Sequence, residues 1–419
     1  MPTLKTWDMA SDRIQKTIDQ VCSVKQGRYL STGEMAPSRS VENPIPVYGA
    51  NGILGFTNRA MYTEPVTLVP CRGNGCGLIQ RTEGPSWISN NAMACPPLVG
   101  TESLYLHYLL FKSDFGDVIT GSAQPQITAG HLTRKTVPFT PDLAEQTSIG
   151  HILGTIDEKI ELNRRMNATL EAMARALFQS WFVDFDPVRR NAEGVIPRPE
   201  DSLFPDSFED SAKGEIPRGW IPTTLGKEAD FSTGFAFKSK TFVAESDVRL
   251  ARGDNVKEGF FHWDSKARYW PEIAPDLERY RLQVGDVLMG MDGSKIGKNW
   301  VRVRRCDLPC LLVQRVACLR EKNTIGQHYL WILVSDSRFR NFVDAVKTGT
   351  SIPHISGGQI KAFDRVRPPA GDTRVFKRFE ELVGPLGEQI DANIEQSQTL
   401  SALRDALLPR LLSGELSIP

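Results

Sequence analysis

Residues 143–182 read LAEQTSIGHILGTIDEKIELNRRMNATLEAMARALFQSWF, and this stretch decides how the rest of the chain is interpreted. If positions are taken from 149 onward in alternating steps of four and three residues, eight of the ten positions are apolar. The pattern continues for more than four heptads. This period of 3.5 residues is typical of a coiled-coil seam and requires a second long helix to cover it. The predicted seam positions are Ile149, Leu153, Ile156, Ile160, Asn163, Asn167, Leu170, Ala174, Leu177 and Trp181.

A second copy of this helix occurs 230 positions further along the chain. Residues 386–412, LGEQIDANIEQSQTLSALRDALLPRLL, align with residues 156–182. Asn163 and Asn393 share one seam position, where a buried amide typically fixes the register of a helix pair. Two unrelated amphipathic helices are the alternative, and the matching polar residues count against it. Gly384-Pro385 is expected to break or begin the second helix and so to shorten its seam. That seam comprises Ile390, Asn393, Leu400 and Leu407.

Segments that precede each helix also repeat. TGSAQPQI at 120–127 aligns with TGTSIPHI at 348–355, an offset of 228. Gly73 and Gly77 align with Gly293 and Gly297, an offset of 220. Because the markers keep the same order in both halves, the sequence predicts duplication of a whole unit, a globular domain followed by a helix.

The fold class predicted from these patterns is α+β, with two mixed α/β domains and two long helices. Glycine-punctuated runs between 21 and 98 predict β structure, and 103–115 predicts a helix. Residues 1–20 show a short amphipathic helical pattern. The proline- and charge-rich segment before the second domain predicts an extended linker. The expected boundaries are 1–142 and 216–370 for the domains, 143–184 and 371–419 for the helices, and 185–215 for the linker.

Length and composition describe a globular chain of two to four domains. It has 50 basic and 50 acidic residues, which counts mildly against a stand-alone nucleic-acid binder but not against one inside a larger assembly. No apolar run reaches the roughly 18 residues of a membrane span, and no signal-peptide pattern opens the chain, so a cytoplasmic protein is expected. Seven cysteines without a CxxC pair and six scattered histidines favour free thiols and no metal site.

The sequence contains no motif that would make this chain an enzyme. P-loop, GxSxG, HExxH, adenine-methyltransferase and glycine-rich cofactor patterns are all absent from it. The acidic run at 184–187 follows the helix directly and is interpreted as helix-end packing rather than as a catalytic cluster. We therefore expect no catalytic residues, no metal and no cofactor bound by the chain itself.

Binding residues are predicted on the repeated glycine turns. Lys and Arg neutralise phosphates, while Asn, Gln, Ser, Thr and Arg reach base edges. KIGKNWVRVRR at 295–305 carries five basic residues and no acid, with Trp300 between them. A solvated turn, a strand edge or a helix cap is the alternative at each position. The predicted DNA contacts are Arg72, Asn74, Thr120, Ser122, Gln124, Ser294, Lys295, Lys298, Thr348, Thr350 and Ser351.

These segments together resemble the specificity subunit of type I restriction-modification systems. The resemblance rests on the TG(S/T)xxPxI segment before each helix, on the repeated helices and on ALFQSWFVDFDPV at the end of the first. VYGANGILGF at 47–56 resembles the family's first recognition domain, and GDVLMGMDGSKIGK at 285–298 its second. STGFAFKSKTF at 232–242 also resembles the second domain, and it adds Lys238 to the predicted contacts. The family implies that the two helices pair as an antiparallel coiled coil with a pseudo-twofold repeat.

The resemblance implies a non-catalytic reader of double-stranded DNA. Each recognition domain would read one half of an asymmetric, split site, with the helices as a ruler of about 55–60 Å against a DNA turn of about 34–36 Å. Two methyltransferase subunits with S-adenosylmethionine would methylate adenine N6, and two restriction subunits with ATP and Mg would cleave. The alternatives are an assembly scaffold whose domains bind protein, and a self-contained methyltransferase or nuclease.

Overall fold

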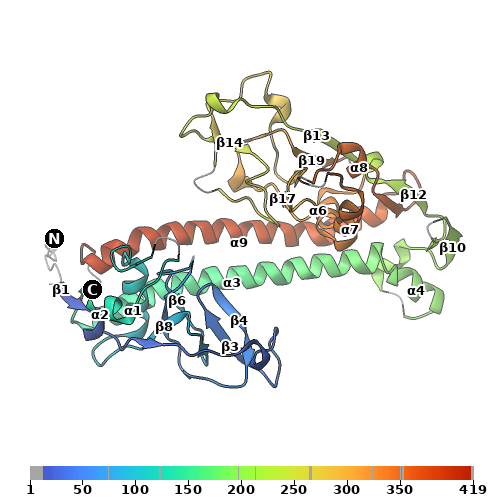
Figure 1. Cartoon of the computed structure of the whole chain (residues 1–419). Helices are drawn as coiled ribbons and strands as arrows, with labels where there is room; N and C mark the ends of the chain where they lie inside the picture. The colour runs from blue at the N-terminus through green and yellow to red at the C-terminus, as the bar shows by residue number, and fades with distance from the viewer. Residues whose placement is uncertain are drawn as a thin grey trace, which may run out of the picture. The chain divides into compact units, whose positions relative to one another are not determined.

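The computed structural model describes residues 13–73, 75–121, 124–196, 198–212, 214–263, 267–322, 324–349, 351 and 353–416. The chain divides into two compact units, of which the first is Met1–Leu162 with Gln396–Pro419 and the second is Asn163–Glu395. Two helices of 40 residues, α3 (Leu143–Phe182) and α9 (Arg374–Ser413), each contribute one part to each unit (Figure 1).

Helix α9 runs without interruption through Gly384-Pro385, so the prediction that the second helix breaks or begins there is wrong. An interior proline removes one backbone hydrogen bond and crowds the preceding turn, at a cost of about 3 kcal/mol. Phe379, Val383 and Ile390, on both sides of the proline, are buried in the core of the second unit. Burying one such side chain contributes about 1.5–3 kcal/mol, so packing outweighs the local preference.

The first unit combines three small sheets with short helices. Strand order is β2-β8-β5-β6 in one sheet and β4-β3-β7 in another, and β1 pairs with β9. Because β1 pairs with β9, residues 14–17 are a strand rather than part of the expected N-terminal helix; residues 1–12 lie outside the described residues. The elements are β1 (Ile14–Thr17), η1 (Ile18–Gln20), β2 (Lys25–Gln26), η2 (Thr32–Glu34), β3 (Ile45–Gly49), β4 (Gly52–Thr57), β5 (Thr67–Pro70), β6 (Gln80–Arg81), β7 (Trp87–Ile88), β8 (Ala92–Cys95), α1 (Ser103–Lys112), α2 (Ala129–Arg134) and β9 (Thr136–Phe139).

The second unit repeats this arrangement. Its four-stranded sheet has the order β13-β19-β16-β17, its three-stranded sheet the order β15-β14-β18, and β12 pairs with β20. The elements are α4 (Asp186–Glu193), η3 (Pro199–Leu203), β10 (Phe208–Ser211), β11 (Gly214–Pro217), β12 (Ile221–Thr224), α5 (Leu225–Glu228), β13 (Ala229–Thr233), η4 (Ser239–Thr241), β14 (Val248–Ala251), β15 (Tyr269–Trp270), η5 (Glu278–Tyr280), β16 (Val287–Gly290), β17 (Trp300–Arg302), η6 (Arg305–Asp307), β18 (Cys310–Leu312), β19 (Val316–Glu321), α6 (Gln327–Ser335), α7 (Ser337–Val346), α8 (Gly357–Lys361) and β20 (Asp364–Arg367).

Strand order and direction confirm the predicted internal duplication. In both three-stranded sheets the central strand pairs antiparallel with one neighbour and parallel with the other. In both units the strand pair next to the long helices is antiparallel, and a matched backbone hydrogen bond follows it: Ile18 N donates to Lys135 O, and Leu225 N to Phe363 O, each at 2.9 Å. The mixed α/β fold class of the prediction is therefore correct.

The segment predicted as an extended linker is folded instead. It contains α4, η3 and the β10-β11 hairpin, and Phe185, Val188 and Phe204 are buried in the core of the second unit. Arg190 binds Asp201 through two hydrogen bonds, Nη2 to Oδ1 at 2.5 Å and Nε to Oδ2 at 2.9 Å. The prediction failed because the segment is rich in prolines and charges, and these outnumber the few apolar side chains that anchor it in the core.

Within each unit, α3 and α9 lie side by side and antiparallel (Figure 1). In the second unit, Asn163 Nδ2 donates to Asn393 O at 3.3 Å, and Asn393 Nδ2 to Asn167 Oδ1 at 2.8 Å. In the first, Arg404 Nη1 binds Asp157 Oδ1 at 2.7 Å. The predicted seam residues Ile149, Leu153, Ile156, Asn163, Ile390 and Asn393 are buried, whereas Ile160, Leu170, Leu177, Leu400 and Leu407 are half-buried.

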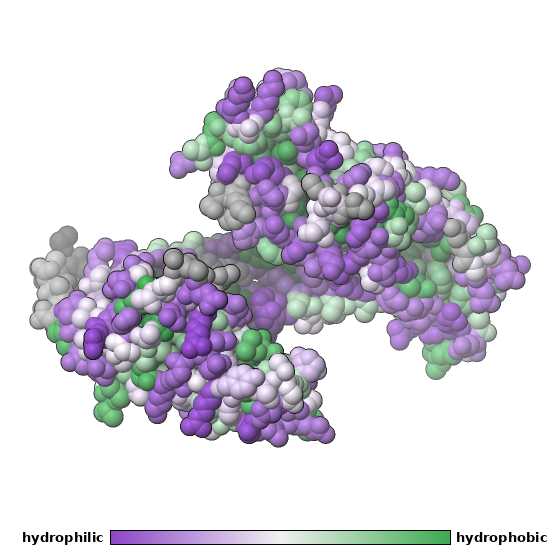
Figure 2. All heavy atoms as spheres, in the orientation of Figure 1, coloured by the Kyte–Doolittle hydropathy of each residue, from purple (hydrophilic) through white to green (hydrophobic). Residues whose placement is uncertain are grey.

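Polar residues cover most of the face shown in Figure 2, and apolar residues are scattered between them. Within the described residues, no helix is long and apolar enough to cross a membrane. All seven cysteines have free thiols.

Candidate nucleic-acid interface

In the first unit, the glycine turn after β5 and the TGSAQPQI segment are joined by backbone hydrogen bonds. Gly73 N donates to Pro125 O at 3.1 Å, and Ile127 N donates to Cys71 O at 3.1 Å. Thr120 and Gln126 exchange two backbone bonds of 2.9 Å, which closes the segment into a loop. Two segments almost fifty positions apart are therefore joined, and we call the described residues of 71–77 and 120–127 the first loop pair.

The second unit contains the same construction. Gly293 N donates to Pro353 O at 3.0 Å, and Ile355 N donates to Met291 O at 2.9 Å. Thr348 and His354 exchange backbone bonds of 2.9 and 2.7 Å. We call residues 291–297 with 348–355 the second loop pair. It follows β16, as the first loop pair follows β5 in the matching position of its sheet.

The backbone conformation of the two loop pairs is alike down to individual glycines. Three glycines in each pair have positive φ, between 77° and 94°, which residues with a Cβ adopt only with strain. The matched glycines are Gly73 with Gly293, Gly77 with Gly297, and Gly121 with Gly349. The side chains differ, since Arg72 in the first pair stands where Asp292 stands in the second. The two loop pairs therefore share a backbone conformation but present different side chains.

An open groove of about 590 Å³ adjoins the second loop pair. Ser294 and Lys295 line it as predicted contacts, and Lys238 lies between two further lining residues, Phe237 and Ser239. Sequence reasoning missed most of the other polar residues of the groove because residues 252–257 and 314–315 come from distant segments that only the sheet topology brings together, and it did not single out Asn299 within the run 295–305. These missed residues are Arg252, Asp254, Lys257, Asn299, Gln314 and Arg315. Four cationic side chains against two carboxylates suit a phosphate-bearing ligand.

The fold divides the basic run at 295–305 into exposed and buried residues. Lys295, Lys298 and Arg305 are exposed. Arg302 and Arg304 are buried and bind Asp391 of α9, at 2.7 Å and 3.3 Å. Burial lowers the pKa of Arg302 and raises the pKa of Asp391, so that desolvation acts against this pair. These two arginines attach the sheet to the helix within the second unit and are not available to a ligand.

The remaining predicted contacts are exposed on the loop pairs. Arg72, Thr120 and Gln124 lie on the first, and Thr348 and Ser351 on the second. The hydroxyl groups of both threonines have partners within their own loops. Thr120 Oγ1 donates to Gln126 O at 3.3 Å, and Thr348 Oγ1 lies 3.0 Å from His354 Nε2. The predicted contacts Asn74, Ser122 and Thr350 lie outside the described residues.

The structure offers no metal-binding cluster in the part of the chain that it describes. The acidic run at 184–187 connects α3 to α4. Phe185 has a left-handed conformation, φ 53°, and α4 begins at Asp186.

Comparison with known proteins gives consistent matches. A family profile described as the type I restriction modification DNA specificity domain matches residues 12–172. The MjaIX specificity subunit of a type I restriction enzyme from Methanocaldococcus jannaschii is 27% identical over 331 residues, covering 77% of this chain and 71% of that protein. The EcoAI specificity subunit from Escherichia coli is 30% identical over 197 residues, covering 46% of this chain and 33% of that protein.

The fold has a solved counterpart. The crystal structure of a type I restriction-modification S subunit from M. genitalium matches with a TM-score of 0.64 and 15% identity, covering 97% of this chain and 98% of that one. The chain is similar to specificity subunits of type I restriction enzymes over most of its length, and it shares the fold of a solved S subunit.

Proposed function

We propose that this chain determines the DNA sequence recognised by a type I restriction-modification complex, with each unit reading one half of an asymmetric, split site. The observation that carries this proposal is the pair of matched loop pairs with unlike side chains. A repeated backbone presents two readers in the same way to double-stranded DNA, and the different side chains select different bases. Residues 1–142 and 216–370 are the recognition domains in this proposal.

The helices serve as the spacer between the two half-sites. A helix of 40 residues is about 60 Å long, whereas successive major grooves on one face of DNA are about 34–36 Å apart. The repeated helices also offer similar docking surfaces to two methyltransferase subunits. The chain itself is non-catalytic: S-adenosylmethionine, ATP and Mg belong to the methyltransferase and restriction partners, in the cytoplasm.

The groove beside the second loop pair supports phosphate contact by Lys295. DNA affinity that depends on such contacts falls with salt, with a slope of about −0.9 per phosphate neutralised. Lys295→Ala and Arg72→Ala should each weaken binding by the assembled complex and reduce the salt slope by about 1. Lys112→Ala in α1 and Lys322→Ala after β19 are the matched controls, because both lysines are exposed but lie outside the loop pairs.

The decisive experiment is to co-express the chain with its partner methyltransferase and to map methylated adenines in genomic DNA by single-molecule sequencing. A split, asymmetric motif with a fixed spacer is the expected result. A stable complex without a methylated motif would favour the assembly scaffold instead. A continuous or palindromic motif would contradict the assignment of one half-site to each unit.

A further inference from the structure

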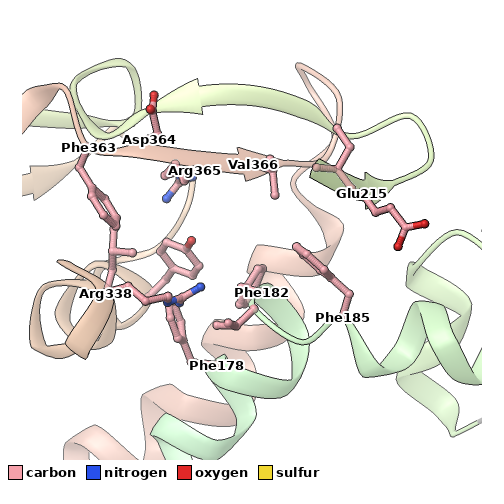
Figure 3. A pocket seen from close by; sticks show the side chains of 13 residues that line it. Phe178, Phe182, Phe185, Glu215, Arg338, Phe363, Asp364, Arg365 and Val366 are labelled. Atoms are coloured by element: carbon pink, nitrogen blue, oxygen red, sulfur yellow. The ribbon is translucent and has the colours of Figure 1, made fainter. Parts of the chain in front are cut away.

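Two concave sites of the second unit differ in their chemistry, and the first of them is aromatic. Phenylalanine rings at the end of α3 border a cavity of about 200 Å³, together with Arg338 and Arg365 (Figure 3). Arg365 is buried and lies 3.6 Å from the Glu228 carboxylate, which Arg367 binds at 2.8 Å. Arg338 Nε donates to Asp336 Oδ1 at 2.9 Å. Since carboxylates of the same unit lie beside both arginines, the rings dominate this cavity.

The second concave site is the polar groove beside the second loop pair, and Asp292 lies in its wall. The other carboxylate of the groove, that of Asp254, binds Arg252 Nη2 at 3.1 Å. The Asp292 carboxylate has neither a hydrogen bond nor an ion pair among the residues that the structure describes, and both of its oxygens are accessible. The groove therefore presents one open acceptor among four cationic side chains.

Backbone contacts fix the position of Asp292 on the second loop pair. Asp292 and His354 form an antiparallel bridge, and Arg72 and Gln126 form the equivalent bridge in the first unit. A glycine with positive φ follows each of the two charged residues, at 94° after Asp292 and at 77° after Arg72. The two units therefore hold a side chain of opposite charge at one matched backbone position.

A carboxylate at this position is unsuited to the phosphate backbone of DNA, because like charges repel each other. A cation there, such as Arg72, neutralises a phosphate instead. A carboxylate accepts hydrogen bonds, and the donor that Asp and Glu bind in the major groove is the N4 amino group of cytosine. Adenine presents its N6 amino group next to the acceptor N7, which repels a carboxylate. The chemistry of Asp292 thus favours cytosine among the four bases.

We propose that Asp292 determines specificity by accepting a hydrogen bond from N4 of one cytosine in the half-site that the second unit reads. The proposal rests on the proposed function and deepens it, because it names a base and the residue that selects it. Lys257, Lys295 and Arg315 of the same groove attract the phosphates beside that base and offset their repulsion of the carboxylate. Guanine and thymine present acceptors in the major groove and so leave Asp292 without a donor.

The test compares the methylated motifs of the wild type and Asp292→Asn, each co-expressed with the partner methyltransferase. The wild type should methylate sites that have cytosine at one fixed position of one half-site. Asparagine presents a donor beside an acceptor, the pattern that pairs with N6 and N7 of adenine, so the variant should accept adenine at that position. On duplexes that carry each of the four base pairs there, the preference of the purified complex for cytosine should fall by about tenfold. The other half-site and the spacer should stay unchanged.

Asp254→Asn is the matched control, since it removes the same charge from the same groove, but from a carboxylate that Arg252 already binds. This variant should alter DNA affinity and keep the wild-type motif. Asp292→Asn should unfold at the same temperature as the wild type, because its carboxylate has no partner to lose among the described residues.

An unchanged motif in Asp292→Asn would overturn the proposal, as would a change in both half-sites or the same change in Asp254→Asn. In each of these cases the split motif of the wild type would still support the proposed function. A wild-type complex that methylates no split motif would contradict the proposed function, and the role of Asp292 with it.

Discussion

The two units share their strand order, yet they fill equivalent interior positions differently. Val21, Val137 and Phe139 make the interior of the first unit apolar, whereas Glu228, Arg365 and Arg367 place charges at the same positions of the second. The loop pairs show the same relation on the surface, where the backbone is matched and the side chains are not. The comparison shows that the duplicated backbone tolerates exchange of side chains both in the interior and on the surface.

The largest effect is expected at the buried carboxylate. Glu228→Gln leaves two guanidinium groups in the core of the second unit without a counter-charge, so it should lower the free energy of unfolding of that unit by about 3–5 kcal/mol. Urea unfolding measures this change. Asp230→Asn is the control, since Asp230 is exposed and pairs with Lys322 at 3.5 Å, an interaction worth about 0–1 kcal/mol. Equal effects of the two substitutions would mean that the buried charges are as dispensable as the apolar residues of the first unit suggest.

The second prediction concerns pH and distinguishes α1 from α6. His107 in α1 aligns with Trp331 in α6, because Tyr105-Leu106 matches Tyr329-Leu330. Burial, with a smaller contribution from Arg81, lowers the pKa of His107 from 6.5 to about 4. The unfolded chain therefore binds the proton first, and stability is lost as pH falls from about 6.5 to about 4.

This loss should amount to roughly 2–3 kcal/mol in the first unit. His107→Leu should remove this part of the pH dependence, as measured by urea unfolding at a series of pH values. His151→Gln is the control, because His151 is exposed on α3 and should leave the profile unchanged. An identical profile for His107→Leu and the wild type would show that His107 is not the group responsible.

The smallest effect is expected where the two helices differ. Pro385 in α9 aligns with Thr155 in α3, whose hydroxyl donates to His151 O at 2.8 Å. Pro385→Thr restores a backbone donor at an exposed helical position but gives the unfolded chain more freedom. The balance should stabilise the second unit by about 1 kcal/mol, measurable as a rise in Tm. A fall in Tm would mean that α9 bends at Pro385 to fit the sheet packed against it.

Several structural features were predictable because they depend on local sequence. The apolar period located α3, and the repeat of Gly73 and Gly77 at Gly293 and Gly297 located both glycine turns. The prediction failed at Pro385 and in the segment 185–215, where a local preference for breaks or extended chain was outweighed by burial of apolar residues from elsewhere in the chain.

The sequence by itself determined the duplication and the long helices, because periodicity and repeated motifs can be recognised in the linear sequence. Only the tertiary structure decided which polar residues share a surface. It placed Arg252 and Arg315 beside Lys295, and it buried Arg302 against α9. It also brought Arg365 to the aromatic end of α3. The reason is physical: the position of a side chain next to distant residues follows from strand order and register, which local sequence patterns do not encode.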